Sequence, residues 1–365
     1  MNSLFDKTSI NGMVLNNRFV RSATWEGMCE KDGRPTQKLI NLYTDLAEGN
    51  IGLIITGYTY IRPDGKQSPG KMGLYSNEFE ADMKKLVKAV HSKGGKICIQ
   101  LVHAGGQTDS TNAGKRPIAP SSVAVKQFPE IPEEITKDEI DNLVKAFGYS
   151  ARKAKDYGFD AVQMHGAHGY LINQFLSPHT NKRNDEYGGN IENRCRFLME
   201  VYQSIRKEVG DDFPVLIKLN ASDNMSEGLN PDDALIAAKK LDEAGIDAIE
   251  VSAGTSASGN YSPARRKIDS PDKERYNLDL AKNIKKSVNC PVMVVGGFRS
   301  FDIAEKAVTE SAMDYISLSR PFIREPDLIN RWQQGDHSPA KCISCNGCFV
   351  AGYKEGGIYC VQQLN

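Results

Sequence analysis

The sequence predicts an α/β fold, a (β/α)8 TIM barrel followed by a short cysteine-containing C-terminal tail. Strand-like apolar runs alternate with helix-period patterns along the chain, and eight such runs are present. The runs are continuous rather than alternating, which is typical of parallel strands that are buried on both faces. Eight β-then-α units in one chain fit a closed barrel better than an open doubly wound sheet.

The eight predicted strands are spaced along almost the whole chain. They cover residues 17–24, 52–57, 96–103, 161–165, 214–221, 248–254, 291–297 and 315–322. Amphipathic helices are predicted between them, among others at residues 37–48, 78–92, 137–156, 191–208 and 232–244. Asn190, which follows two glycines, is predicted to cap the N-terminus of the helix at 191–208.

Length and composition favour one barrel domain rather than two domains. The chain has 365 residues, of which 40% are hydrophobic and 25% are charged, so it can bury a large core. We expect a barrel over residues 1–335 and a tail over residues 336–365. Three long loops, at about residues 104–133, 167–189 and 255–275, follow strand C-terminal ends. They should therefore cluster over one mouth of the barrel and form a pocket for a small-molecule substrate.

Charge and targeting signals exclude several classes of partner. Lys plus Arg and Asp plus Glu both number 46, so the formal net charge is zero and nothing favours nucleic acid or an anionic membrane. The N-terminal stretch MNSLFDKTSINGM lacks the basic and apolar regions of a signal peptide, and we expect a cytoplasmic protein. Four isolated cysteines, Cys29, Cys98, Cys195 and Cys290, suit a reducing compartment.

One strand end gathers groups that can move protons. The predicted strand at 161–165 ends in His165, and His168 and Tyr170 follow with glycines between them. Two imidazoles and a phenol at a strand C-terminal end are placed where a barrel performs its chemistry. A histidine at such a position is often structural, and H-x-x-H is half of some metal sites. However, no H-E-x-x-H pattern or nearby carboxylate at ligand spacing supports zinc here.

Two further features predict an anion site and a buried cation. Strand seven ends in Gly296 and Gly297, and strand eight in Ser319 and Arg320, each before a helical pattern. Barrels often bind phosphate at this pair of loops, where helix N-termini supply N–H donors. Lys218 lies in an otherwise apolar strand, so its ammonium either has a partner inside the barrel or extends along the wall to solvent.

The segment after Tyr170 carries the most specific motifs, LSP followed by DEYGGN and ENR. It resembles the signature of the old yellow enzyme family of FMN-dependent oxidoreductases, and the resemblance covers nearly the whole chain. It implies bound FMN, NAD(P)H as electron donor and reduction of activated C=C bonds. In that family pattern His165 and His168 hydrogen-bond the substrate carbonyl, and Tyr170 protonates the α-carbon.

The resemblance also implies a set of flavin-binding positions. Lys218 falls where relatives usually carry an Arg near flavin N1, and Gln100 matches a glutamine at the isoalloxazine edge. The backbone that lines the ring is expected at Ser22, Ala23, Thr24 and Gly57, and the phosphate at Gly296, Gly297, Ser319 and Arg320. Trp25 departs from the pattern, because relatives usually carry a small Thr or Cys there.

The tail contains four cysteines, Cys342, Cys345, Cys348 and Cys360, spaced C-x2-C-x2-C-x11-C. This spacing fits a [4Fe–4S] cluster, an all-cysteine zinc site, or reduced thiols that pack against the barrel. It resembles the cluster-binding segment of the 2,4-dienoyl-CoA reductase branch, although the second gap there is usually one residue longer.

Two other functions stay open at the level of sequence. One is an amine-oxidising or demethylating relative that passes electrons through a tail cluster, and the other is a non-catalytic electron-transfer flavoprotein. The chain has no G-x-G-x-x-G motif in a dinucleotide-binding context, so a nicotinamide would share the site over the flavin. The sequence identifies neither the substrate nor the choice of NADH or NADPH, and a homo-oligomer stays open.

Overall fold

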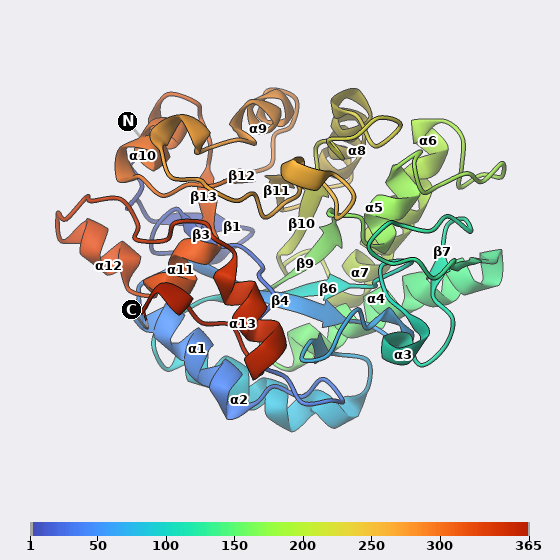
Figure 1. Ribbon diagram of the computed structural model, residues 1–365, viewed down its shortest axis with the longest axis horizontal. Coiled ribbons are helices and arrows are strands. Elements are labelled where there is room, and N and C mark those ends of the chain that lie inside the picture. Colours follow the sequence, from blue (N-terminus) through green and yellow to red (C-terminus); the bar gives the residue numbers. More distant parts are fainter. Residues whose placement is uncertain (1–2, 364–365) are drawn as a thin grey trace.

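The computed structural model describes residues 3–363 and shows a closed barrel of eight parallel strands surrounded by helices (Figure 1). Around the barrel the strand order is β3-β13-β12-β11-β10-β9-β6-β4, and β4 pairs with β3 to close the ring. The barrel strands are β3 (Phe19–Arg21), β4 (Leu53–Tyr60), β6 (Ile97–Val102), β9 (Ala161–Gly166), β10 (Val215–Asn220), β11 (Ala248–Ser252), β12 (Val292–Val295) and β13 (Tyr315–Leu318). The predicted (β/α)8 fold is confirmed.

Each barrel strand is followed by a helix on the outside of the barrel. These helices are α1 (Gln37–Glu48), α2 (Glu80–His91), α4 (Lys137–Asp156), α7 (Arg196–Val209), α8 (Pro231–Glu243), α9 (Leu278–Lys285), α10 (Phe301–Thr309) and, after β13, α11 (Arg320–Arg324) with α12 (Leu328–Gln333). The predicted helix at 191–208 is broken at Cys195 into α6 (Ile191–Arg194) and α7. Asn190 caps α6 as predicted, because its side chain accepts the Asn193 N–H.

Most predicted strands are longer than the observed ones, and the first and the last differ most. The first strand ends at Arg21 rather than at Thr24, and the last ends at Leu318 rather than at Phe322. Residues 320–324 form α11, with Pro321 in its first turn. Proline fits a first helical turn, where its missing N–H is not needed, and it cannot continue a strand ladder.

A hairpin that was not predicted closes the N-terminal end of the barrel. Strands β1 (Thr8–Ile10) and β2 (Met13–Leu15) pair antiparallel through Asn11 and Gly12, which both have positive φ, at 42° and 78°. Asn-Gly is the preferred sequence for such a two-residue turn. Apolar side chains of the hairpin pack against the lowest layer inside the barrel, which includes Val20, Leu53, Leu216 and Tyr315. The end of the barrel that the hairpin closes is therefore filled by apolar side chains.

The barrel interior becomes polar toward its C-terminal end. On β10 the apolar Leu216 belongs to the layer next to the N-terminal hairpin, and Lys218 lies two residues further along the strand. On β11 Ala248 is followed in the same way by Glu250. Because alternate residues of a strand point to the same face, these positions form successive layers inside the barrel. The polar layers place functional groups beneath the open mouth.

The loops over this mouth contain short elements of their own. They are η1 (Pro63–Gly65), β5 (Met72–Gly73), η2 (Asn77–Phe79), α3 (Ser110–Ala113), β7 (Ile118–Ala119), β8 (Glu133–Glu134), α5 (Leu171–Leu176), η3 (Gly259–Tyr261) and η4 (Pro271–Lys273). The tail adds α13 (Gly347–Glu355) and η5 (Val361–Gln363). In Figure 1 the tail returns across the barrel, and α13 is drawn in red in front of β3 and β4. Within residues 3–363 no helix is long and apolar enough to cross a membrane.

Candidate functional site

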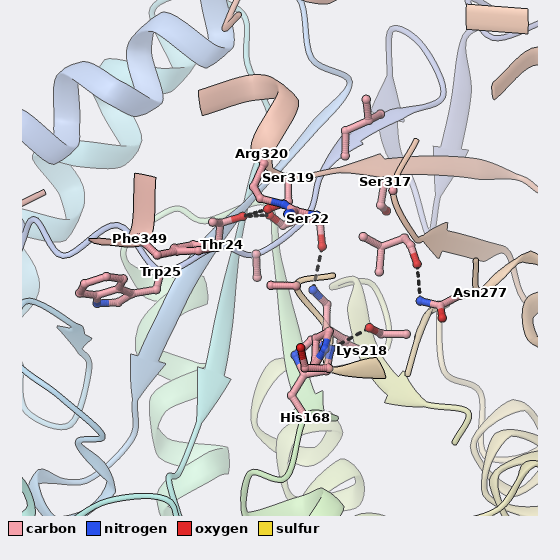
Figure 2. A pocket seen from close by; sticks show the side chains of 18 of the residues that line it. Ser22, Thr24, Trp25, His168, Lys218, Asn277, Ser317, Ser319, Arg320 and Phe349 are labelled. Carbon is pink, nitrogen blue, oxygen red and sulfur yellow. Dashed lines mark hydrogen bonds between the residues drawn. The ribbon is translucent and has the colours of Figure 1, made fainter. Parts of the chain in front are cut away.

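A cavity of about 350 Å³ lies at the C-terminal ends of the barrel strands (Figure 2). Most of the positions assigned to a flavin from the sequence line it, namely Ser22, Ala23, Thr24, Trp25, Lys218, Gly297, Ser319 and Arg320. His168 and Tyr170 line the same cavity. The structure therefore brings the predicted cofactor positions and two of the three predicted catalytic residues to one place.

A chain of polar side chains crosses the barrel beneath the cavity. Gln100 Nε2 donates to Gln163 Oε1 at 2.7 Å, and Gln163 Nε2 donates to Glu250 Oε2 at 2.8 Å. Lys218 Nζ lies 3.4 Å from the same Glu250 oxygen and donates to Ser22 Oγ at 2.8 Å. The lysine therefore has partners inside the barrel, and the alternative of an ammonium in solvent is wrong.

Burial sets the charge balance of this pair. Lys218 is 2% exposed and Glu250 is fully buried, and Glu250 Oε1 has no hydrogen-bond partner among the described residues. Desolvation lowers the pKa of Lys218, and the attraction of Glu250 opposes that shift. Lys218, labelled in Figure 2, therefore places an ammonium at the edge of the cavity, and Glu250 is its carboxylate partner.

Three predicted flavin positions do not line the cavity. Gln100 instead donates its side-chain amide to Gln163. Gly57 packs against the Glu26 carboxylate and the Thr24 carbonyl, so that a Cβ atom there would have no room. A Cβ atom at Gly296 would meet the backbone of Tyr276 and Asn277. The assignment of these three residues as flavin contacts stays a prediction, which for the two glycines concerns the backbone.

Arginines without carboxylate partners gather at one end of the cavity. Arg320 Nη1 donates to the Arg265 carbonyl at 2.7 Å and to Asn346 Oδ1 at 2.6 Å, and Arg299 donates to the carbonyls of Ile268 and Ala340. The Nε atoms of Arg265 and Arg299 are buried and have no partner among the described residues. Unsatisfied buried donors of positive charge fit an anion such as the phosphate of FMN.

Gly297 shapes this end of the cavity. Its φ of +78° favours glycine, and a Cβ atom would lie 2.8 Å from the Tyr276 ring. The backbone can therefore turn closely beneath a ligand before α10 begins at Phe301. The residues of this end fit the terminal phosphate of a flavin mononucleotide.

The predicted catalytic residues form an aromatic cluster. The His165 ring centroid lies 5.1 Å from that of His168 and 4.8 Å from that of Tyr170, and His168 Nε2 lies 2.7 Å from Ser252 Oγ. His165 accepts the Ala167 N–H through Nδ1, which leaves its proton on Nε2. His168 has a φ of 62°, so the chain turns sharply after β9 and returns Tyr170 to the cavity.

Burial fixes the protonation states of this cluster. It lowers the pKa of His165 and of His168 well below the ordinary value, and the neighbouring Lys218 charge lowers both further. Burial raises the pKa of Tyr170 well above 10. At neutral pH both imidazoles are therefore neutral and the phenol keeps its proton. Such groups can donate hydrogen bonds to a carbonyl oxygen and a proton to a carbon.

The tail forms one wall of the cavity rather than lying apart from it. Ser344 and Phe349 line the cavity, and the Tyr353 ring lies over the Trp25 ring with a centroid distance of 4.2 Å. The Ile358 N–H donates to the Glu26 carbonyl at 2.8 Å. Trp25 therefore packs against residues of the tail, which gives this unusual residue a structural neighbour that its local sequence does not reveal.

The four tail cysteines do not make a recognisable metal centre. Among residues 3–363 no three or more His, Cys, Asp or Glu side chains are grouped so that they could hold a metal ion. Two features of thiolate loops are present, since the Ser344 N–H points to Cys342 Sγ at 3.5 Å and the Gly347 N–H to Cys345 Sγ at 3.3 Å. The iron–sulfur cluster and the zinc site therefore stay predictions. All eight cysteines lack a disulfide partner in the structure.

Several cavity residues were not predicted from the sequence. They are Gln67, Gln107, Phe128, Ser252, Tyr276, Asn277, Phe298, Arg299 and Phe349. Gln107 and Phe128 lie in one of the long loops that were predicted to cover the mouth, whereas the other seven lie in segments outside those loops. Arg299 carried a usable signal, because it is a cation two residues after a strand-ending glycine pair.

Comparison with known proteins gives a consistent result. A model of the NADH:flavin oxidoreductase / NADH oxidase family matches residues 3–338. An NADH oxidase of Thermoanaerobacter brockii is 36% identical over 95% of this chain, which spans 53% of that protein. An NADPH dehydrogenase of Clostridium acetobutylicum is 34% identical over 89% of this chain and 93% of its own length. The chain thus spans about half of one of these relatives and nearly all of the other.

Solved structures show the same pattern. A 2-naphthoyl-CoA reductase in complex with 2-naphthoyl-CoA superposes with a TM-score of 0.90 at 30% identity, covering 98% of this chain and 56% of that one. An old yellow enzyme homologue from Zymomonas mobilis has a TM-score of 0.78 at 29% identity, covering 91% and 93%.

Proposed function

Because the chain belongs to the NADH:flavin oxidoreductase / NADH oxidase family, the FMN-dependent oxidoreductases that include old yellow enzyme, we propose that it reduces activated C=C bonds with electrons from NAD(P)H. The substrates would be α,β-unsaturated carbonyl compounds. The observation that carries this proposal is the neutral His165, His168 and protonated Tyr170 cluster beside a cavity with a cation at its edge.

The cavity fits FMN on the chemistry of its donors. Arg320, Arg299 and the Gly297 turn would hold the phosphate, and Ser22, Ala23 and Thr24 with Lys218 would border the ring system. Bound FMN would supply the hydride chemistry, which no side chain of the protein can provide. Lys218 is placed to favour an anionic reduced cofactor, because an oriented cation in a dry site stabilises developing negative charge.

The chain's own residues would bind, polarise and protonate the substrate. His165 and His168 would donate hydrogen bonds to the carbonyl oxygen, which withdraws electrons from the alkene. Tyr170 has no hydrogen-bond partner for its hydroxyl among the described residues and lines the cavity, so it is free to give its proton to the α-carbon. The cluster would orient these donors toward the substrate, which is where the protein would contribute to the rate.

An anaerobic stopped-flow experiment tests this function. Flavin reduction by NADH or NADPH and its reoxidation by 2-cyclohexenone would be followed separately at the flavin absorption band. We expect both half-reactions to occur and the saturated ketone to be the product. Reduction by the nicotinamide without reoxidation by any of a panel of enones, enals and nitroalkenes would refute the proposed substrate class.

A further inference from the structure

Lys71 is a buried amine that none of the roles above uses. It precedes β5 in the loop that follows β4, and it is only 4% exposed. Its Nζ lies 4.2 Å from the centroid of the Tyr58 ring and 5.9 Å from that of the Trp25 ring. Among residues 3–363 it has neither a hydrogen bond nor an ion pair. A buried ammonium that is balanced only by aromatic rings lacks the acceptor that such a group normally has.

A second buried donor without a partner lies beside it. The Nε1 atom of Trp25 is buried and has no hydrogen-bond partner among the described residues. The Trp25 ring is held in place between Gly27, Gly352 and Tyr353. Two donors without a partner among the described residues therefore lie in one small region. Trp25 lines the cavity, whereas Lys71 does not line it and lies 5.9 Å from the Trp25 ring centroid.

The Glu26 carboxylate attracts the Lys71 charge, but among residues 3–363 no hydrogen bond or ion pair joins the two side chains. Glu26 Oε1 already accepts bonds from Arg21 at 2.7 Å, from the Tyr43 hydroxyl at 2.7 Å and from the Gly57 N–H at 3.1 Å. Since buried polar groups are nearly always satisfied, an external acceptor is the simplest partner for this pair of donors. A carboxylate suits them best, because it offers negative charge to the ammonium and lone pairs to the indole N–H.

The two donors also lie close to the predicted proton donor. The Tyr58 ring, over which the Lys71 ammonium sits, meets the Tyr170 ring edge to face with a centroid distance of 5.0 Å. A ligand could thus extend from Tyr170 along this aromatic wall to the ammonium. We propose that Lys71 and Trp25 Nε1 form a carboxylate-binding subsite, so that the substrates are unsaturated carbonyl compounds that carry a second, remote carboxylate. This inference rests on the proposed function and names its substrate class.

Binding to the oxidised holoenzyme tests the subsite without any turnover. The probes are 4-carboxybenzylideneacetone and its methyl ester, whose dissociation constants would be measured by titration calorimetry at pH 6.5. We expect the acid to bind at least about tenfold more tightly than the ester, as a charge-assisted hydrogen bond implies. Lys71→Met should abolish this preference, and Lys71→Arg should restore most of it. Lys66→Met is the matched control, since Lys66 lies on the same loop and donates to the Lys31 carbonyl away from the cavity.

The wild-type protein provides a second test that needs no variant. The titratable groups that face the Lys71 amine are Glu26, Cys29, Tyr58 and His165. Burial raises the pKa of Cys29 and of Tyr58 and lowers that of His165, while the pKa of Lys71 is lowered to about 7. Between pH 6.5 and 8.5 we therefore expect the acid, and not the ester, to bind progressively more weakly.

An acid-to-ester preference that Lys71→Met leaves unchanged, or that does not respond to pH in the wild type, would overturn the subsite. Selective binding of the acid without reoxidation of the reduced flavin by it would instead refute the proposed function and leave the subsite standing.

Discussion

The buried pair of Lys218 and Glu250 allows the sharpest prediction. Lys218→Met removes a cation that lies 3.4 Å from Glu250 Oε2 and leaves a fully buried carboxylate, with one oxygen already lacking a partner. Breaking a buried ion pair by removing one member costs about 3–5 kcal/mol. Unfolding entropy of about 2.1 cal/mol/K per residue over 365 residues converts this cost into a fall in Tm of about 4 to 7 °C.

The double variant Lys218→Met/Glu250→Gln separates charge from packing. It removes both charges, and Gln keeps an oxygen that can accept the Gln163 Nε2–H. The loss of Tm should therefore be much smaller than in Lys218→Met alone, because residues in contact are not additive. Differential scanning calorimetry with excess FMN checks this. If Tm falls as much or more in the double variant, the ion pair with Lys218 does not stabilise the Glu250 carboxylate.

The same single variant tests the position of Lys218 beside the flavin. Without the cation the anionic reduced cofactor loses stabilisation, so the FMN reduction potential should fall by at least about 30 mV, which corresponds to about 1.4 kcal/mol for two electrons. Redox titration with a reference dye measures this shift. A variant that retains FMN at an unchanged potential would refute the assignment of Lys218 as a cofactor ligand, whatever its effect on Tm.

Three further predictions follow from single residues. Tyr170→Phe should slow reoxidation of the flavin by an enone about 10²- to 10⁴-fold in stopped flow and leave reduction by NAD(P)H nearly unchanged, because only the former needs the phenol proton; equal losses in both would indicate a structural role. Lys71→Met should remove a pH dependence of stability. The pKa of Lys71 is about 7 in the folded protein against an ordinary 10.5, so the unfolded chain binds more protons between these pH values. The free energy of unfolding of the wild type should therefore rise with pH by about 1.4 kcal/mol per pH unit. Urea denaturation at pH 7.5 and 9.5 measures that rise, and a rise of the same size in the variant would contradict it. Gly297→Ala should weaken FMN retention at least tenfold on dialysis, because φ of +78° and the Tyr276 ring at 2.8 Å oppose a Cβ atom; full retention would move the phosphate elsewhere.

The secondary structure was predictable where local signals agree with the fold. Helices α1 and α4 begin and end at the predicted residues, because Thr36 and Thr136 cap their first turns and their apolar positions follow the helix period. The Asn11-Gly12 turn was equally readable, but its three-residue strands are too short to show an alternating pattern. The predicted end of the last strand was wrong, because Pro321 lies in the first turn of α11. Proline lacks the N–H that a strand ladder needs, and this should have outweighed the apolar run in the prediction.

The site was predictable only where one strand carries the information. Lys218 reads as a buried cation because its own strand is apolar, but its partner Glu250 lies on the next strand and becomes a neighbour only through the register of the sheet. The same register gives Gln100, which was predicted to contact the cofactor, a partner on the neighbouring strand, since its amide donates to Gln163 on β9. Depth inside a barrel depends on strand stagger, which no single strand encodes.

Trp25 extends this reasoning to the wall of the pocket. Its ring packs on Tyr353, which lies more than three hundred residues further along the chain, and neither local sequence indicates the other. The Lys71 ammonium, which comes from a third segment, lies 5.9 Å from the centroid of that ring, and the indole N–H has no partner among the described residues. The two donors without partners are therefore a property of the folded chain alone. If they bind a carboxylate, the tail takes part in substrate choice by fixing the Trp25 ring, although its cysteines lie outside that contact.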